Sequence, residues 1–159
     1  MDEARWTRIF EDKAKKMRKQ DSWQLEFDED IVPNRPNYGW KQCVRNTCAR
    51  FKCTSCGRGW SSNRVMVLFH MQLRNMRGTI KIRPLYQKCK NCSEGPMEKP
   101  SIETGSIYVL MENLVEKIRE KCYHENTGPK FRHFKSYDGN NPHEPAHCQG
   151  CKLGICKRS

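Results

Sequence analysis

Cys53-Thr54-Ser55-Cys56 and Cys89-Lys90-Asn91-Cys92 are two CxxC pairs separated by 32 residues, and they decide the fold of this chain. Each pair can present both of its sulfurs to one ion from a single tight turn. Four cysteine sulfurs are the tetrahedral ligand set that zinc takes in closed structural sites. Gly57 follows the first pair and suits the unusual backbone angle at which such a turn often ends. The sequence therefore predicts one structural zinc ion bound by Cys53, Cys56, Cys89 and Cys92.

Two β-like runs lie between the pairs. Residues 65–69 are almost wholly apolar, whereas residues 79–83 alternate between polar and apolar with a period of two. Residues 74–78 can turn the chain between these runs. A hairpin closed by zinc at its open end is a zinc ribbon, so we expect a zinc-ribbon-like antiparallel β hairpin or sheet.

Apolar residues at helical spacing predict two helices packed against this ribbon. The first either packs on the ribbon, which its short apolar stripe favours, or lies on a membrane or a partner. The second has an apolar face of about five turns and is expected to cover the hairpin. The apolar positions are Trp6, Ile9, Phe10, Ala14 and Met17 in the first helix, and Ile107, Leu110, Met111, Leu114, Val115, Ile118 and Cys122 in the second. Between the first helix and the ribbon, residues 23–27 alternate and predict an edge strand. The predicted fold class is therefore α+β.

Length and composition predict one domain in a reducing compartment. With 159 residues, of which 36% are apolar, the chain depends partly on metal for its stability. No apolar run is long enough to span a membrane, and the N-terminus has no signal-peptide core. In a cytosolic setting, ten cysteines are typical of zinc ligands rather than of disulfides. Within the single domain, residues 1–159, we distinguish an N-terminal helix and strand (1–40), a basic zinc ribbon (41–99), a helix (100–123), and a loop with a second zinc site (124–159).

The C-terminal region holds one histidine and three cysteines within fourteen residues, which predicts a second zinc site. Its donors are His143, Cys148, Cys151 and Cys156. His147 competes for the imidazole position, but it adjoins Cys148 and would strain the chelate. Cys122 is the alternative fourth ligand, and its other interpretation is a buried thiol at a helix end. The sequence thus predicts two structural Zn²⁺ ions.

Neither predicted zinc site has the features of a catalytic one. Hydrolytic zinc needs an open coordination position, and both sites are closed by four protein ligands. The HxE and PCxxC pattern of zinc deaminases is absent, and no CxxC pair lies in the βαβ frame of a thioredoxin-like protein. Cys43 and Cys48 lie near the first pair and are interpreted as surplus thiols. We therefore expect that the chain is not an enzyme.

Positive charge is concentrated on the ribbon. Residues 41–99 carry 13 Lys and Arg against 2 Asp and Glu, within a net charge of +12 for the chain. Such a surface attracts phosphate, acidic protein or anionic lipid, and charge alone does not select among them. On the ribbon the candidate anion-binding and RNA-binding residues are Arg74, Arg77, Lys81 and Arg83.

A later loop interleaves basic residues with aromatic ones. This pattern can stack nucleobases and neutralise phosphates, or it belongs to a surface loop whose aromatic side chains turn inward. The candidate RNA-binding residues of this loop are Lys130, Phe131, Arg132, Phe134 and Lys135.

Several motifs spread along the chain resemble those of one known family. They are Ala49-Arg50-Phe51-Lys52-Cys53-x-x-Cys56, Gly59-Trp60, Val67-Leu68-Phe69-His70-Met71, Gln87-Lys88-Cys89-x-x-Cys92, Asn113-Leu114-Val115, Lys121-Cys122-Tyr123, and Pro142-His143 followed by Cys148-x-x-Cys151-x-Leu153-Gly154-Ile155-Cys156. The family is the receptor-transporting proteins, which carry the three-CxxC zinc-binding domain. The family pattern keeps the histidine and the three cysteines of the second site, but it has no cysteine at the positions that correspond to Cys43 and Cys48.

The resemblance implies an intracellular accessory protein that helps G-protein-coupled receptors, notably odorant and taste receptors, to reach the plasma membrane. Such a protein works in the cytoplasm, or on the cytosolic face of the endoplasmic reticulum or plasma membrane through a C-terminal hydrophobic anchor, which this sequence lacks. Some members of the family are interferon-induced and are associated with viral RNA. An RNA-binding antiviral effector is therefore the alternative function, and receptors or RNA are the expected partners.

Overall fold

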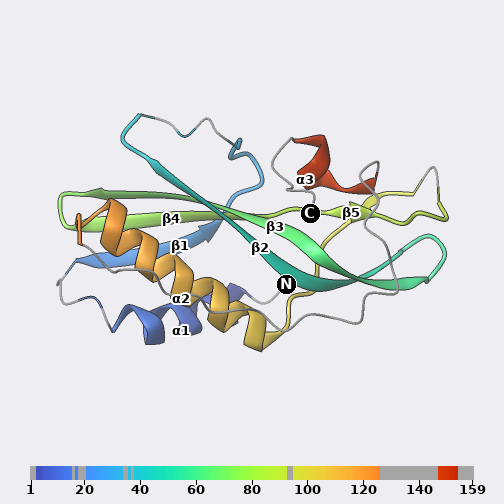
Figure 1. Cartoon of the computed structure of the whole chain (residues 1–159), viewed down its shortest axis with the longest axis horizontal. Helices are drawn as coiled ribbons and strands as arrows, with labels where there is room; N and C mark the ends of the chain where they lie inside the picture. The colour runs from blue at the N-terminus through green and yellow to red at the C-terminus, as the bar shows by residue number, and fades with distance from the viewer. Residues whose placement is uncertain are drawn as a thin grey trace.

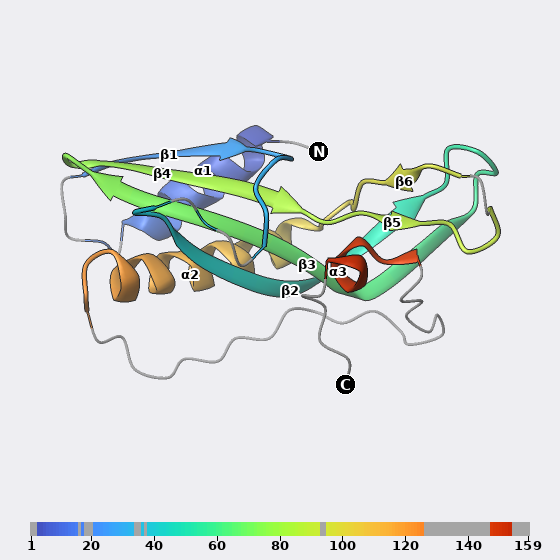
Figure 2. The ribbon, with the colours of Figure 1, turned by 90° about the horizontal axis from the view of Figure 1, so that it is seen from above.

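The computed structural model describes residues 3–15, 17, 21–33, 36, 38–92, 95–125 and 147–153. Within them, a four-stranded sheet carries two helices on one face, and a two-stranded sheet lies beyond one of its ends (Figure 1, Figure 2). The strand orders are β1-β4-β3-β2 and β5-β6. This α+β architecture agrees with the predicted fold class. In chain order the elements are α1 (Glu3–Ala14), β1 (Ser22–Phe27), β2 (Lys41–Lys52), β3 (Gly59–Arg74), β4 (Arg77–Pro84), β5 (Gln87–Lys88), β6 (Met97–Glu98), α2 (Thr104–Lys121) and α3 (Gln149–Lys152).

The predicted hairpin is formed by β3 and β4, which pair antiparallel over the whole of β4. Its loop contains only Asn75 and Met76, whose φ angles are 51° and 65°. Two successive positive φ angles characterise a type I′ turn, whose twist matches that of the flanking strands. Ile80 and Ile82 are fully buried, whereas Lys81 between them is partly exposed. The predicted alternation along β4 is therefore confirmed.

β2 is a long strand that the sequence pattern did not predict. It pairs antiparallel with β3 along its whole length, with a bulge between Thr47 and Ala49. Because the bulge shifts the register, burial along β2 does not alternate as it does along β4. The first CxxC pair consequently forms the turn between β2 and β3. Cys43 and Cys48, interpreted from the sequence as surplus thiols near that pair, are buried residues of β2.

β1 is an edge strand, as predicted, but it pairs with β4 in parallel rather than antiparallel. Trp23 of β1 lies directly over Gly78 of β4, where an added Cβ would be 2.2 Å from the indole ring. The indole Nε1 of Trp23 donates a hydrogen bond to the hydroxyl of Tyr123, which in turn donates to Asp21. The N-terminal segment is thus attached both to β4 and to the end of α2.

α1 and α2 lie side by side on one face of the large sheet (Figure 1, Figure 2). Trp6 of α1 is 1% exposed and meets Phe27 edge-on, with the ring centroids 5.3 Å apart. This burial confirms that the first helix packs on the ribbon. α1 and α2 lie within the predicted ranges 1–40 and 100–123, and each begins about one turn before the first residue of its apolar stripe. The core beneath the sheet includes Val67, Phe69, Met71, Ile80, Ile82, Ile107, Leu110, Met111, Leu114 and Ile118.

None of the helices in the described ranges combines the length and the apolar character needed to cross a membrane.

Gly78→Ala should lower the free energy of unfolding by about 1–3 kcal/mol, because the added methyl group would overlap the Trp23 ring. Gly105→Ala is the matched control. Nothing lies within 4 Å of a Cβ added at Gly105, in the first turn of α2, so alanine there should add up to about 1 kcal/mol. Urea titration measures both values. Equal stability of the Gly78 variant and the wild type would show that Trp23 is not fixed over β4.

Candidate metal centre

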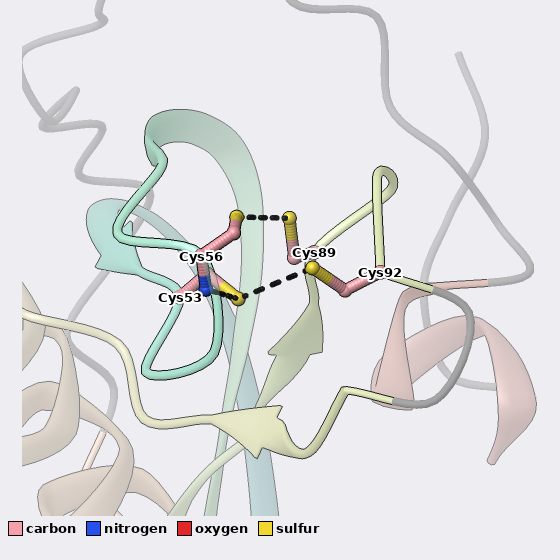
Figure 3. Close-up of side chains that lie close together, drawn as sticks. All are labelled: Cys53, Cys56, Cys89 and Cys92. Atoms are coloured by element: carbon pink, nitrogen blue, oxygen red, sulfur yellow. Dashed lines mark hydrogen bonds between the residues drawn. The ribbon is translucent and has the colours of Figure 1, made fainter.

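The candidate centre forms where two turns meet at one end of the hairpin (Figure 3). Cys53 and Cys56 belong to the turn between β2 and β3, and Cys89 and Cys92 follow β5. Because β4 runs antiparallel to β3 and leads directly into β5, the chain returns to the level at which β3 began. The fold therefore brings together all four residues that the sequence predicts as ligands of the first zinc ion.

The spacing of the sulfurs fits a tetrahedral metal site. The four Sγ atoms lie within 4.8 Å of one another. The Sγ atoms of Cys53 and Cys92 are 3.7 Å apart, and those of Cys56 and Cys89 are 3.8 Å apart. A tetrahedron with Zn–S bonds of about 2.3 Å has S···S edges of about 3.8 Å. The four residues therefore fit a zinc ion, and as a four-sulfur set they leave no open coordination position.

Backbone hydrogen bonds orient the first turn around its sulfurs. The N–H of Cys56 donates to the Sγ of Cys53 over 3.4 Å. The N–H of Gly57 donates to the carbonyl of Cys53, and Gly57 has a φ of 76°, which confirms the conformational role expected for this glycine. The hydrogen bond from the Cys56 N–H also lowers the pKa of Cys53, because it stabilises the thiolate.

Arg58 adds positive charge directly beside the sulfurs. Its Nε donates to the Sγ of Cys89 over 3.3 Å and lowers the pKa of that thiol to about 6. The guanidinium lies 4.9 Å from the centroid of the Trp60 ring, which stacks on Phe51 with a centroid separation of 5.2 Å. Since a zinc ion with four thiolates carries a net charge of −2, Arg58 neutralises part of the charge of the loaded centre.

Four sulfurs at these distances cannot all be ionised unless a cation is present. Hydrogen bonds with the sulfurs of Cys56 and Cys53 raise the pKa of Cys92 to about 12. Without a metal the group would therefore retain protons, and metal binding would displace them. The centre is chemically suited to a divalent cation that prefers thiolate ligands.

Glu98 of β6 also supports the first turn. Its carboxylate accepts hydrogen bonds from the N–H of Thr54 over 2.7 Å and from the hydroxyl of Thr54 over 2.9 Å. Glu98 is only 8% exposed, so these hydrogen bonds compensate for the burial of its charge. Sequence reasoning missed both Arg58 and Glu98. For Glu98 the sequence did offer a signal, because it is one of only two acidic residues between positions 41 and 99.

One predicted ligand of the second site lies close to the first centre. Cys148 forms a bridge with Gln87 of β5 and is 3% exposed. The next residue, Gln149, donates its N–H to the carbonyl of Tyr86 and accepts a hydrogen bond from the N–H of Tyr86 at its side chain. The C-terminal segment therefore extends the small sheet along β5.

The remaining ligands of the second site stay predictions. His143 and Cys156 lie outside the described residues, and only the backbone of Cys151 is described, within α3. The Nδ1 atom of His147 is buried and has no hydrogen-bond partner in the described part of the chain. His147 therefore remains the competitor of His143 for the imidazole position.

The other cysteines lie away from the candidate centre. Cys122 is the C-cap residue of α2, and burial raises its pKa. It lies at the hairpin-turn end of the sheet, whereas Cys148 lies at the metal-centre end, so the structure does not bring these two together (Figure 1). Cys43 belongs to the core, and the Sγ of Cys48 lies 3.4 Å from the hydroxyl of Ser106 in α2.

The four candidate anion-binding residues of the ribbon have different environments. Lys81 forms an ion pair of 3.3 Å with Asp28, and Arg83 donates to a backbone carbonyl at residue 31. The N–H of Asp30 and the Lys81 ammonium lower the pKa of Asp28. Arg74 and Arg77 are both exposed. The candidate RNA-binding residues 130–135 lie outside the described residues.

Comparison with known proteins supports the zinc assignment. Residues 46–154 match the family model of a zinc-binding domain of the 3CxxC zinc-ribbon type, a range that includes all four cysteines of the centre. The chain is 32% identical to receptor-transporting protein 2 of Mus musculus, over 94% of this chain and 69% of that protein. It is also 32% identical to receptor-transporting protein 1 of Homo sapiens and to receptor-transporting protein 3 of Mus musculus, over 94% and 99% of this chain.

The chain is shorter than these relatives. It spans 58% of the human protein and 34% of receptor-transporting protein 3. No solved protein structure is significantly similar to the chain.

Cys53→Ser should remove one equivalent of zinc per chain and destabilise the fold strongly, because it leaves a vacancy in a site whose binding energy contributes to folding. Cys43→Ser is the control. It changes a buried thiol outside the centre, and should keep the zinc while costing about 1 kcal/mol. Elemental analysis and denaturation measure the two effects. A Cys53 variant with the zinc content of the wild type would contradict the assignment.

The wild-type chain should contain two zinc ions. Cys148→Ser should reduce the count to one, whereas Cys122→Ala should retain both ions and cost about 1 kcal/mol, because it removes only a partly buried thiol at the far end of the sheet. Elemental analysis of the three proteins tests this. One zinc ion in the wild type, or loss of an ion in the Cys122 variant, would refute the predicted second ligand set.

Proposed function

Because the chain belongs to the receptor-transporting protein family, we propose that it is a zinc-stabilised accessory protein that promotes the transport of receptors to the cell surface. The extent of the similarity carries this proposal. It covers 94% of the chain, so it is not restricted to the cysteine pairs. The segment shared with proteins named for receptor transport is thus the sheet, the helices and the metal centre together.

G-protein-coupled receptors are the proposed cargo, with odorant and taste receptors as the first candidates. The proposed location is the cytoplasm, or the cytosolic face of the endoplasmic reticulum or plasma membrane. The eight cysteines whose side chains are described are free thiols, the state that a reducing compartment maintains. This location would leave the sulfurs available for zinc and would place the protein next to the cytosolic segments of receptors.

A binding role fits the chemistry of the centre better than a catalytic one. Its four sulfurs fill a tetrahedral coordination shell, so a zinc ion bound there has no position for water or substrate. Such an ion would hold the β2–β3 turn and the segment after β5 together, and would supply rigidity rather than reactivity. We infer that the surface supported by this scaffold, not the ion itself, interacts with receptors.

The RNA-binding antiviral alternative has less support. The relatives compared above are named for receptor transport and not for RNA. Of the four ribbon cations, Lys81 and Arg83 already have partners within the chain. RNA binding therefore remains a prediction from charge.

Coexpression with a receptor that carries an extracellular epitope should raise the ratio of surface to total receptor. Staining of intact and of permeabilised cells measures this ratio. Cys53→Ser should abolish the increase, because the scaffold loses its ion, whereas Cys43→Ser should retain it. The receptor should also copurify with the wild type and with the Cys43 variant. An unchanged ratio with the zinc-loaded wild type, across odorant and taste receptors, would contradict the proposal.

A further inference from the structure

The tip of the β3–β4 hairpin lies at the end of the sheet away from the metal centre (Figure 1, Figure 2). It consists of Arg74, Asn75, Met76 and Arg77. Met76 is 67% exposed, and both arginines are exposed. In the described part of the chain, neither arginine has an ion pair or a side-chain hydrogen bond. The tip therefore presents two unneutralised cations on either side of an apolar side chain.

Three features of this tip oppose stability. Arg74 and Arg77 are direct cross-strand partners, and like charges opposite each other destabilise a hairpin. Met76 has a φ of 65°, a left-handed conformation that is unfavourable for a bulky side chain and that glycine usually fills in this turn. Met76 also exposes a large apolar side chain to water. Local conflicts of this kind are concentrated at functional sites.

A positively charged pocket of about 190 Å³ adjoins the tip. Gln72 and Leu73, the residues of β3 that directly precede the tip, form part of its wall. Lys41 of β2 and Lys121 of α2 line it as well, together with His124. No carboxylate lines the pocket. Two lysines from two elements, β2 and α2, therefore line a hollow next to the hairpin tip.

Tyr38 adds an exposed aromatic ring at the same end. It is fully exposed, and the following residue, Gly39, lines the pocket. Within the described residues, Met76 and Tyr38 are the two most exposed of the large apolar side chains. Tyrosine is enriched where proteins meet the membrane–water interface, because its ring is apolar and its hydroxyl is polar.

Neighbouring acidic residues do not neutralise this end. Glu120 and Glu125, near the end of α2, pair with Lys117 and Arg119 at 3.2 Å and 3.1 Å. Asp21, which precedes β1, accepts a hydrogen bond from the neutral Tyr123 hydroxyl and contributes one negative charge, against the four cations Arg74, Arg77, Lys41 and Lys121. The positive field at the hairpin tip is therefore directed toward solvent.

We propose that this end of the sheet docks on an anionic lipid bilayer. Arg74 and Arg77 contact lipid phosphates, Met76 enters the region between the headgroups, and the pocket lined by Lys41 and Lys121 accepts a headgroup phosphate. Charge complementarity and an apolar tip flanked by cations are the features that favour binding at this interface. RNA could use the cations and stack on the Tyr38 ring, but it would gain nothing from the exposed methionine at the tip, which an interface with lipid favours. This activity goes beyond receptor transport and needs no receptor.

The first test measures sedimentation of the zinc-loaded full chain with vesicles. Vesicles of phosphatidylcholine and phosphatidylserine should bind it, with an affinity that falls as salt rises, whereas phosphatidylcholine alone should bind little. The double variant Arg74→Gln, Arg77→Gln should lower the partition coefficient for anionic vesicles about 30-fold. Each cation at the membrane surface contributes about 1 kcal/mol, and about 1.4 kcal/mol corresponds to a tenfold change in partitioning. The control is the double variant Lys52→Gln, Lys99→Gln, which also removes two positive charges, but from exposed positions at the metal-centre end of the molecule. This control should bind like the wild type, because its charges are screened at that distance.

The second test uses Met76→Gly, for which the proposal predicts opposite effects on stability and on binding. Glycine relieves the left-handed backbone and produces the Asn-Gly sequence that type I′ turns prefer, so the midpoint of thermal unfolding should rise. Partitioning into anionic vesicles should nevertheless fall, because the apolar side chain is lost. A merely structural methionine would not produce this combination.

Three results would overturn the proposal. The first is equal binding to neutral and anionic vesicles. The second is a loss of binding in the Lys52 and Lys99 variant that equals the loss in the arginine variant. The third is unchanged partitioning of the Met76→Gly variant. If single-stranded RNA binds through the two arginines while vesicles do not bind, the surface belongs to RNA and the lipid proposal is wrong.

Discussion

Four sulfurs from two turns approach within 4.8 Å of one another, and this contact joins the β2–β3 turn to the segment that follows β5. The first turn ends β2 and begins β3, and the second follows β5. Holding these turns together places the start of β3 beside the continuation of β4. Because adjacent thiolates repel each other, the contact needs positive charge. Arg58 supplies part of it directly at Cys89, and a zinc ion would supply the rest.

The distribution of charge in space differs from its distribution along the chain. The ribbon has no acidic residue between positions 41 and 93, yet β1 pairs with β4 and leads into Asp28, which meets Lys81 at 3.3 Å. The middle of β4 is therefore neutralised by the N-terminal segment. The hairpin tip lies beside the start of β1, where Ser22 pairs with Arg77, at the opposite end of β1 from Asp28, and it keeps its charge. A basic stretch of sequence thus becomes a sheet that is partly neutralised at Lys81 and remains cationic at its hairpin tip.

The sequence correctly predicted those features of the fold that depend on residues close together in the chain. The CxxC spacing identified the four clustered cysteines, and the period-two pattern identified the buried face of β4, because each depends on residues close together in the chain. β2 was missed because its bulge interrupts the period. The parallel pairing of β1, and the roles of Arg58 and Glu98, depend on neighbours that are brought close only by folding. The second zinc site remains a prediction, since most of its donors lie outside the described residues.

The parallel pairing of β1 with β4 also has a consequence for synthesis of the protein. Ser22 pairs with Arg77, 55 positions later, so β1 has no strand partner until the hairpin has left the ribosome. Closing so long a loop is entropically unfavourable before the hairpin exists. Until then Trp23, Leu25 and Phe27 lack the surface against which they pack in the finished fold. The emerging N-terminal segment therefore exposes three apolar side chains to water during synthesis, until the edge of β4 becomes available for pairing.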